Sequence, residues 1–337
     1  MTDWVPAAMP YTTARSSSRL GADAPSGHRV VAALDVGGTS TKGDIVDADM
    51  RVVHELRWTT PRRAGPVAVV DSIREHVAEL VELIDASDHE CVATGVVVPG
   101  VVDEARGLAI HSVNLGWWDL PLAAMLDDRS GRPVALGHDV RAGALAEHRL
   151  GAGRGATGML FMPLGYGVAG AIIADGRLLL SGGYAGEIGH LVVEPDGDAC
   201  GCGRHGCLES VASAVSIGRR YAARAGREQA TAAEVADLVR AGDPIARMVW
   251  AEAVGALAFA IGVAATLVAP EVVVIGGGLS LAGELLLEPL RAAVPAWLSF
   301  QPLPRIVGAA LGDRAGCLGA AMLAFQAADR PSRAHRR

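Results

Sequence analysis

The sequence predicts an α/β protein built of two similar lobes. Residues 29–35 (RVVAALD) form an apolar run that ends in the glycine turn VGGTSTK, and residues 43–47 fit the returning strand of a hairpin. The same pattern begins again at 159–163, which lead into the turn LGYGVAG and a return strand at 168–174. A chain of 337 residues is also long for one hydrophobic core. Two hairpins of one kind predict a duplicated architecture with a ligand held between its halves.

Short apolar runs and helical periodicity define the remaining elements of the first half. Apolar residues recur at helical spacing over 67–84, which predicts a helix. The run at 91–98 predicts a buried strand that ends at a Pro-Gly pair. Further expected elements are strands at 51–58 and 133–136 and a helix at 141–150, just after His138 and Asp139.

The second half is expected to be mostly helical. The expected elements are helices near 208–224, 231–241, 244–269, 279–297 and 313–328, and a strand at 272–275. Residues 253–270 (AVGALAFAIGVAATLVAP) are almost long enough to cross a membrane. Their small side chains, and the strand that follows them, favour a buried helix instead.

Composition restricts the partners and the location of the protein. The net charge of −7 and the aromatic content of 4% argue against a nucleic-acid surface. Residues 1–28 hold an early acid, prolines and serines instead of a basic start and an apolar run, so we expect a disordered leader and no export signal. Residues 329–337 are expected to be a disordered tail. The cytoplasm is the expected location.

A cluster of sulfur ligands is the most specific chemical feature of the chain. Cys200, Cys202 and Cys207 lie within eight residues, and His190 lies ten positions before the first of them. Thiolates and an imidazole suit a four-coordinate zinc ion closed by its protein ligands. A disulfide is the alternative, but the number of cysteines is odd and Cys200 and Cys202 are too close in sequence for an easy bridge. The cluster predicts a structural zinc site that also fixes nearby carboxylates.

Three glycine-rich turns follow strands. In the first, Gly37 and Gly38 let backbone amides approach an anion, while Thr39 and Lys42 add a hydroxyl and a charge. The second turn contains Gly165 and Gly167, and the third contains Gly276, Gly277 and Gly278. Each could be a plain tight turn, whereas three in one chain indicate phosphate binding. None matches the P-loop or the dinucleotide fingerprint.

The chain resembles the ROK family of sugar kinases and sugar-responsive repressors. Six segments carry the resemblance, in this order: ALDVGGTSTKGDIVD, VVPGVVD, HSVNLGW, HDVRAGALAE, GYAGEIGH through CGCGRHGCLES, and VVVIGGGLS. They span about residues 29–328, and the GH pair followed by CxCGxxGCLE is the most specific part. The resemblance implies a two-lobed, ribonuclease H-like ATPase fold, as in actin and hexokinase, with a structural zinc site. It implies an N-terminal lobe at 29–138 plus 312–328 and a C-terminal lobe at 139–311.

The resemblance also implies an ATP-dependent hexose kinase with Mg²⁺ as its catalytic ion. Asp139 would be the general base, a task that suits a carboxylate because the sugar hydroxyl must lose one proton. The implied sugar contacts are Gly100, Asn114, His138, Asp139, Glu187, His190 and Glu209. ATP phosphates would lie against the first two glycine turns and the nucleoside near the third, with Asp35 facing Mg²⁺ through water. His190 would bind zinc through one ring nitrogen and the sugar through the other.

Plainer explanations exist for several of these residues. Asp139 could cap the helix that begins near Arg141. Glu187 and Glu209 could pair with surface arginines, and Asn114 could be a turn residue.

The chain departs from the family at two places. The motif around the base is usually NDA followed by N, whereas this chain has His138, Asp139, Val140 and Arg141. His138 could replace the hydrogen bond of the lost asparagine or change which sugar fits. Tyr166 stands in a hairpin that is usually GTG, where its bulk could weaken ATP binding.

Two function classes follow from the resemblance. One is a hexose kinase, with glucose expected first and N-acetylmannosamine, mannose or fructose after it. The other is a sugar sensor without activity, as in the repressors of the family. Those repressors carry a winged-helix domain ahead of the first hairpin, and the 28 residues found there in this chain are too few for one. The kinase is therefore preferred, with no nucleic-acid partner, and it is expected to form a homodimer or homotetramer as its relatives do.

Overall fold

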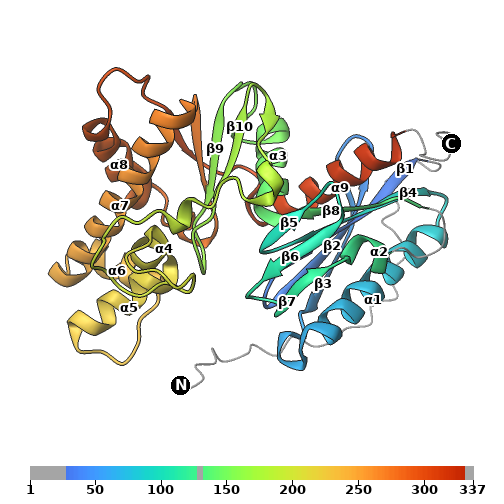
Figure 1. Cartoon of the computed structure of the whole chain (residues 1–337), viewed down its shortest axis with the longest axis horizontal. Helices are drawn as coiled ribbons and strands as arrows, with labels where there is room; N and C mark the ends of the chain where they lie inside the picture. The colour runs from blue at the N-terminus through green and yellow to red at the C-terminus, as the bar shows by residue number, and fades with distance from the viewer. Residues whose placement is uncertain (1–27, 127–131, 331–337) are drawn as a thin grey trace.

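The computed structural model describes residues 28–126 and 132–330 and shows two halves, each built on its own sheet (Figure 1). The expected leader and tail lie outside the described residues, except for His28, Asp329 and Arg330. Asp329 pairs with Arg29 at 3.0 Å, so the start of the tail is tied to the first strand.

The first sheet has the strand order β3-β2-β1-β4-β8. Its strands are β1 (Arg29–Val36), β2 (Ser40–Asp47), β3 (Val52–Thr59), β4 (Glu90–Val98) and β8 (Val134–His138). β1, β2 and β3 form an antiparallel meander, while β4 and β8 run parallel to β1. The predicted hairpin and the predicted third strand are therefore confirmed.

The second sheet repeats this arrangement with the order β11-β10-β9-β12-β13. Its strands are β9 (Met159–Pro163), β10 (Ala171–Ala174), β11 (Arg177–Leu178), β12 (Val272–Gly276) and β13 (Arg305–Gly308). β9, β10 and β11 are antiparallel, and β12 and β13 run parallel to β9. The two sheets thus share one topology, which confirms the duplication inferred from the hairpins. The return strand is shorter than expected and begins at Ala171.

Two helices connect the halves. α3 (Asp139–Leu150) follows β8 of the first sheet and packs on β9 and β10 of the second, and α9 (Ala315–Ala328) follows β13 and packs on β1, β4 and β8. α3 and α9 also contact each other between the sheets, as Figure 1 shows. The expected lobe boundaries at 138/139 and 311/312 remain predictions, and they fall where the chain passes between the sheets.

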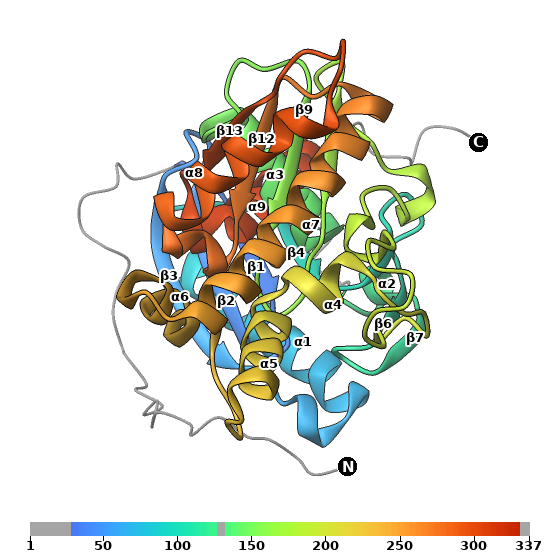
Figure 2. The same cartoon turned by 90° about the vertical axis from the view of Figure 1, so that its left-hand side faces the viewer.

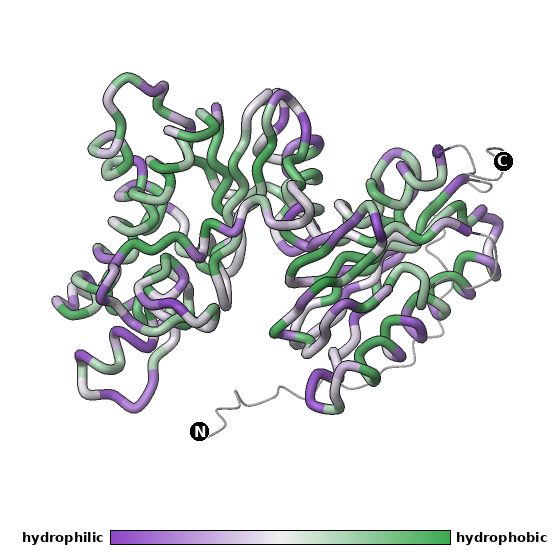
Figure 3. Tube along the Cα trace, in the orientation of Figure 1, coloured by the Kyte–Doolittle hydropathy of each residue, from purple (hydrophilic) through white to green (hydrophobic). Residues whose placement is uncertain are grey.

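The cores follow from the alternation of strand side chains. Val30, Ala32 and Leu34 of β1 pack in the cluster that includes α1 (Pro66–Asp85), whereas Val31 and Ala33 point to the opposite face, beneath α9. In the second sheet, successive side chains of β9 likewise alternate between two core clusters, one on each face of the sheet. Figure 3 shows the hydrophobic residues concentrated along the strands of both halves.

The second half adds a group of helices around α7 (Pro244–Val268). The others are α4 (Leu208–Ala212), α5 (Ala214–Ala225), α6 (Ala232–Ala241) and α8 (Glu284–Ala293). All four contact α7, which crosses in front of β9 and β12 in Figure 2. Among the described residues, α7 is the one helix long and apolar enough to cross a membrane by length and composition. One side of α7 lies in the largest core cluster, which confirms the expected buried helix, although Met248 and Leu267 of α7 are exposed.

Several elements differ from the sequence prediction. The helix expected at 208–224 breaks at Ser213, whose hydroxyl caps Ser216 at the start of α5. The helix expected at 279–297 contains only α8 as regular helix, flanked by 3-10 turns. A three-stranded sheet was not predicted. It consists of β5 (Val101–Asp103), β6 (Leu108–Ser112) and β7 (Trp117–Leu120), followed by the short helix α2 (Leu122–Met125).

Candidate active site

Asp139 is the first residue of α3, where the chain leaves the first sheet and enters the second half. The N-cap of α3 is His138, whose Nδ1 accepts the backbone N–H of Arg141 at 3.4 Å. The plainer explanation of Asp139 as the helix cap is therefore wrong, because Asp139 is the first helical residue. Its Oδ1 accepts the N–H of Val140 at 2.7 Å. Burial raises the pKa of Asp139 to about 6, even though the nearby N–H and the charge of Arg141 act in the opposite direction.

His138 orients the Asp139 side chain. Burial, reinforced by the charge of Arg141, lowers the pKa of His138 to about 3, so the imidazole is neutral. Nδ1 accepts a hydrogen bond, so the remaining ring proton lies on Nε2, which is 3.3 Å from Asp139 Oδ1. His138 is 6% exposed and both ring nitrogens have protein partners. His138 therefore affects the site by holding the Asp139 side chain in place.

A second carboxylate, Asp35, lies at the end of β1. Burial, together with the charge of Asp139 and against the charge of Lys42, raises the pKa of Asp35 to about 6. Lys42 Nζ lies 3.7 Å from Asp35 Oδ2 and donates a hydrogen bond to the carbonyl of Asp313 at 2.8 Å. The only lysine thus ties β2 to the segment that precedes α9. Asp35 and Asp139 therefore lie close enough to influence each other's charge. Such a pair suits a site where one carboxylate faces a metal ion and the other accepts a proton.

The first glycine turn, Gly37 to Thr39, joins β1 to β2. Thr60 donates its hydroxyl hydrogen to the Gly37 carbonyl at 2.8 Å, which holds the turn from outside. Asn114, from the turn between β6 and β7, lies beside it: its Cβ is 3.8 Å from the space that a Cβ on Gly38 would fill. The structure therefore brings the small sheet, which the sequence did not predict, against this turn.

The second and third glycine turns lie side by side. Leu164, just after β9, donates its N–H to the Gly276 carbonyl at 2.9 Å and accepts the N–H of Leu279 at 2.9 Å. Gly277 has φ of 74°, and a Cβ there would collide with the Leu164 backbone. The turn at Gly165 and Gly167 therefore packs directly on the turn at Gly276–Gly278. Tyr166 is 76% exposed at the tip of the second turn.

Glu187 lies among Glu209, His190 and Asp139. Glu209 Oε2 accepts the N–H of Val168 at 3.0 Å, and Glu187 Oε2 lies 4.0 Å from His190 Nε2. Burial raises the pKa of Glu187. The charges of His190 and Arg141 act to lower this pKa, and those of Glu209 and Asp139 act to raise it. Glu187 thus shares one electrostatic neighbourhood with Glu209, His190 and Asp139, and among the described residues neither Glu187 nor Glu209 forms the ion pair with an arginine that was considered as an alternative. Gly100 follows β4 and packs on the backbone of His111 and Ser112 in β6.

The four predicted zinc ligands meet in one place. The ligand atoms of His190, Cys200, Cys202 and Cys207 all lie within 4.8 Å of one another. Cys202 Sγ lies 3.6 Å from Cys207 Sγ, and Cys200 Sγ lies 3.7 Å from His190 Nδ1. Ligands about 2.0–2.3 Å from a tetrahedral zinc ion lie about 3.4–3.8 Å apart, so the set fits the ion. All five cysteines are free, which removes the disulfide alternative.

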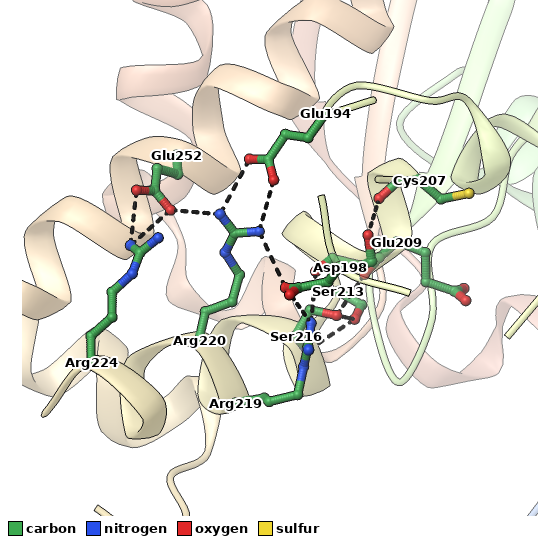
Figure 4. A network of polar contacts seen from close by, with 11 residues as sticks. Glu194, Asp198, Cys207, Glu209, Ser213, Ser216, Arg219, Arg220, Arg224 and Glu252 are labelled. Atoms are coloured by element: carbon green, nitrogen blue, oxygen red, sulfur yellow. Dashed lines mark hydrogen bonds and ion pairs between the residues drawn. The ribbon is translucent and has the colours of Figure 1, made fainter. Parts of the chain in front are cut away.

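Ion pairs anchor the loop that carries these ligands. Arg220 of α5 binds Glu194 at 3.1 Å and Glu252 of α7 at 2.9 Å, as Figure 4 shows. Arg219 binds Asp198 at 2.9 Å. Glu194 thus has a structural role in holding this loop. The loop is held both by the ligand cluster and by charges on the helices behind it.

Comparison with known proteins identifies the family. The sequence profile of the ROK family matches residues 31–327.

The chain belongs to the ROK family.

A glucokinase of Thermotoga maritima is 35% identical over 307 residues, which cover 86% of this chain and 95% of that protein. The structure of a ROK family glucokinase from Streptomyces griseus in complex with glucose and AMPPNP is 32% identical, with a TM-score of 0.76, and the match covers 88% of this chain and 99% of that one. A ROK family transcriptional regulator has a TM-score of 0.80 at 23% identity, covering 90% of this chain and 79% of that one. The fold is thus the ROK fold expected from the sequence, and it is common to kinases and regulators.

Two residues beside the site were missed by sequence reasoning. Arg141, which entered the sequence analysis only as a departure from the expected family motif, is 1% exposed, and its Nε donates to Glu104 Oε1 at 2.9 Å. An arginine within the small-residue helix VRAGALA is a signal that could have marked Arg141 as buried and paired. Glu104 lies in the turn between β5 and β6, and nothing in its local sequence indicates its partner.

Proposed function

We propose that this ROK protein is an ATP-dependent sugar kinase of the glucokinase type, with Asp139 as its general base. The observation that carries the proposal is the position of Asp139: partly buried at the start of α3, oriented by His138, and in electrostatic contact with both Asp35 and Glu187. Phosphoryl transfer needs one proton acceptor, charge neutralisation and alignment. The Val140 N–H and His138 bind Oδ1 of Asp139, so Oδ2 is the oxygen suited to take the hydroxyl proton.

The sugar would be held by groups on both halves of the molecule. Glu187, Glu209 and His190 belong to the segment around the metal cluster. In the first half, Gly100 directly precedes β5 and Asn114 lies in the turn between β6 and β7. Carboxylates accept hydrogen bonds from hydroxyl groups, and an amide both donates and accepts, so this set suits a polyhydroxylated ligand. His190 Nδ1 faces Cys200, which leaves Nε2 on the side of Glu187 and the sugar. The glucokinase relatives make glucose the first sugar to test.

ATP would lie along the three glycine turns. The backbone N–H groups of Gly38 and Gly167 would bind phosphates, while those of Gly37 and Gly165 close the turns by donating to the carbonyls of Ser40 and Gly167. The joined turns at Gly276–Gly278 would support the nucleoside. Mg²⁺, when bound, neutralises the phosphate charge, and Asp35 is the carboxylate suited to hold it through water. Lys42 pairs with Asp35 and donates a hydrogen bond to the Asp313 carbonyl. Its positive charge would therefore act on the phosphates through space, without direct contact. The exposed ring of Tyr166 leaves the backbone of its turn accessible.

The cysteine cluster would hold a structural zinc ion. His190 and three thiolates complete four coordination sites, so no position is left for substrate. The ion would act by fixing the segment that carries Glu187, His190 and Glu209.

The pH dependence of turnover tests the role of Asp139. Only the carboxylate can accept a proton, and burial raises the pKa of Asp139 to about 6. We expect kcat to be level above about pH 7 and to fall about tenfold per pH unit well below 6. A pH series of kcat with saturating sugar and ATP measures this. A level profile down to pH 4.5 would contradict the assignment.

A sugar panel tests the function itself. Purified protein with Mg²⁺ and ATP should release ADP when it is given glucose, N-acetylmannosamine, mannose or fructose, and not without sugar. Tight sugar binding measured by calorimetry, with no ADP release for any sugar, would favour the sensor.

A further inference from the structure

Arg141 lies at the centre of a contact between the two halves of the molecule. Besides its bond to Glu104, its Nη1 donates to the carbonyl of Gly183 at 3.0 Å and its Nη2 donates to the carbonyl of Val102 at 2.9 Å. The three acceptors are 37 to 42 residues from Arg141 in the sequence. One guanidinium group thus joins three segments: α3 itself, the stretch that carries Val102 and Glu104, and the stretch at Gly183.

Two of these segments lead to opposite sides of the proposed sugar site. Val102 belongs to β5, which directly follows Gly100, and Gly183 ends the 3-10 turn η2 (Ser181–Gly183), four residues before Glu187. The two segments also touch: Gly183 has φ of 93°, and a Cβ there would collide with the Val102 carbonyl. Arg141 therefore spans the seam where the first-half side of the site meets the second-half side.

An ion pair and the planar geometry of the guanidinium hold Arg141 in this seam. The Glu104 side chain is 14% exposed, and its Oε1 also accepts the backbone N–H of His138 at 3.4 Å. A buried arginine is tolerated when its charge is paired and its donors are bonded, and the planar fork can reach three acceptors that a lysine ammonium could not reach together. The same helical turn carries His138, Asp139 and Arg141, so the seam is fixed relative to the proposed base.

We propose that Arg141 is a positioning residue for the sugar, because it fastens β5, next to Gly100, to the segment at Gly183, next to Glu187. This inference rests on the proposed kinase function. It assigns a role to Arg141, one of the residues at which this chain differs from the motif expected for the family. Loss of Arg141 lets the two sides of the site separate, which weakens sugar binding. ATP binding, which uses the glycine turns, does not depend on this seam.

The test compares steady-state kinetics of the wild type, Arg141→Met, Arg141→Lys and Glu104→Gln. The sugar is whichever of glucose, N-acetylmannosamine, mannose and fructose the wild type phosphorylates fastest. Arg141→Met should raise the KM for this sugar by about 10 to 100-fold, because charge-assisted hydrogen bonds are lost, while the KM for ATP stays within about twofold. Arg141→Lys and Glu104→Gln should raise the sugar KM by less. Calorimetry of sugar binding without ATP should show the same order of affinities.

Arg291→Met is the matched control. Arg291 in α8 also donates to a backbone carbonyl, that of Ile306, and pairs with a carboxylate, Glu284, but it lies outside the proposed site. It should alter the unfolding temperature alone. An unchanged sugar KM in Arg141→Met would overturn the proposal, as would parallel rises in the KM values for sugar and ATP. If Arg141→Met does not fold, unchanged sugar KM values in both Arg141→Lys and Glu104→Gln overturn it. A wild type that phosphorylates no sugar contradicts the kinase function instead, which separates the two failures.

Discussion

Replacing Asp139 with asparagine is expected to lower kcat by about 10² to 10⁴-fold, the usual contribution of a general base. Asparagine keeps an oxygen that can accept the N–H of Val140, so the start of α3 and its contact with His138 are retained. It cannot accept the hydroxyl proton. Sugar affinity, measured by calorimetry, should therefore change far less than turnover, measured by ADP release.

Asp44→Asn provides a matched control for this variant. Burial also raises the pKa of Asp44 to about 6, but Asp44 lies within β2, where its charged neighbours are Glu55, Arg57 and Arg314. The two replacements therefore remove carboxyl groups of similar acidity from different places. Asp44→Asn should retain turnover, and a kcat for Asp139→Asn within tenfold of the wild type would argue against Asp139 as the base.

Replacing Cys202 with serine is expected to remove the metal and to lower the free energy of unfolding by several kcal/mol. Structural zinc contributes about 10–16 kcal/mol to the folding of small zinc-finger peptides. The loss should be smaller here, because Arg219 and Arg220 still hold the loop through Asp198 and Glu194. Metal analysis should find about one zinc per wild-type chain and none in the variant, and thermal unfolding gives the stability.

The same variant tests whether the metal supports the sugar site. His190 is both a member of the ligand cluster and a neighbour of Glu187, so metal loss should raise the KM for sugar. Cys91→Ser is the control, since Cys91 is a buried thiol of β4 outside the cluster and should not affect metal content. Wild-type protein that is free of metal and fully stable would refute a structural zinc ion.

The repeated glycine hairpins carried most of the fold prediction, because each combines an apolar strand, a turn that needs glycine, and a return strand within 20 residues. The ligand cluster was predictable for a similar reason. Three of its four members lie within eight residues, where tight turns bring them together whatever the rest of the fold does.

The small sheet escaped prediction because β5, β6 and β7 have only three, five and four residues, too few for a period to be visible. β13, with four residues, was missed in the same way. At Ser213 the helical pattern continues through the break, and only the hydroxyl cap shows where one helix ends. The seam at Arg141 depends on contacts across about 40 residues of sequence, which no local pattern encodes.

The most direct test of the central claim follows the γ-phosphate of ATP by ³¹P NMR in the presence of wild-type protein, Mg²⁺ and glucose. A sugar kinase predicts a hexose phosphate signal that grows in a one-to-one ratio with ADP, depends on the sugar, and disappears in Asp139→Asn. If glucose and the other three hexoses give no sugar phosphate, or if ATP yields only inorganic phosphate, the account given for Asp139 and the surrounding site is contradicted.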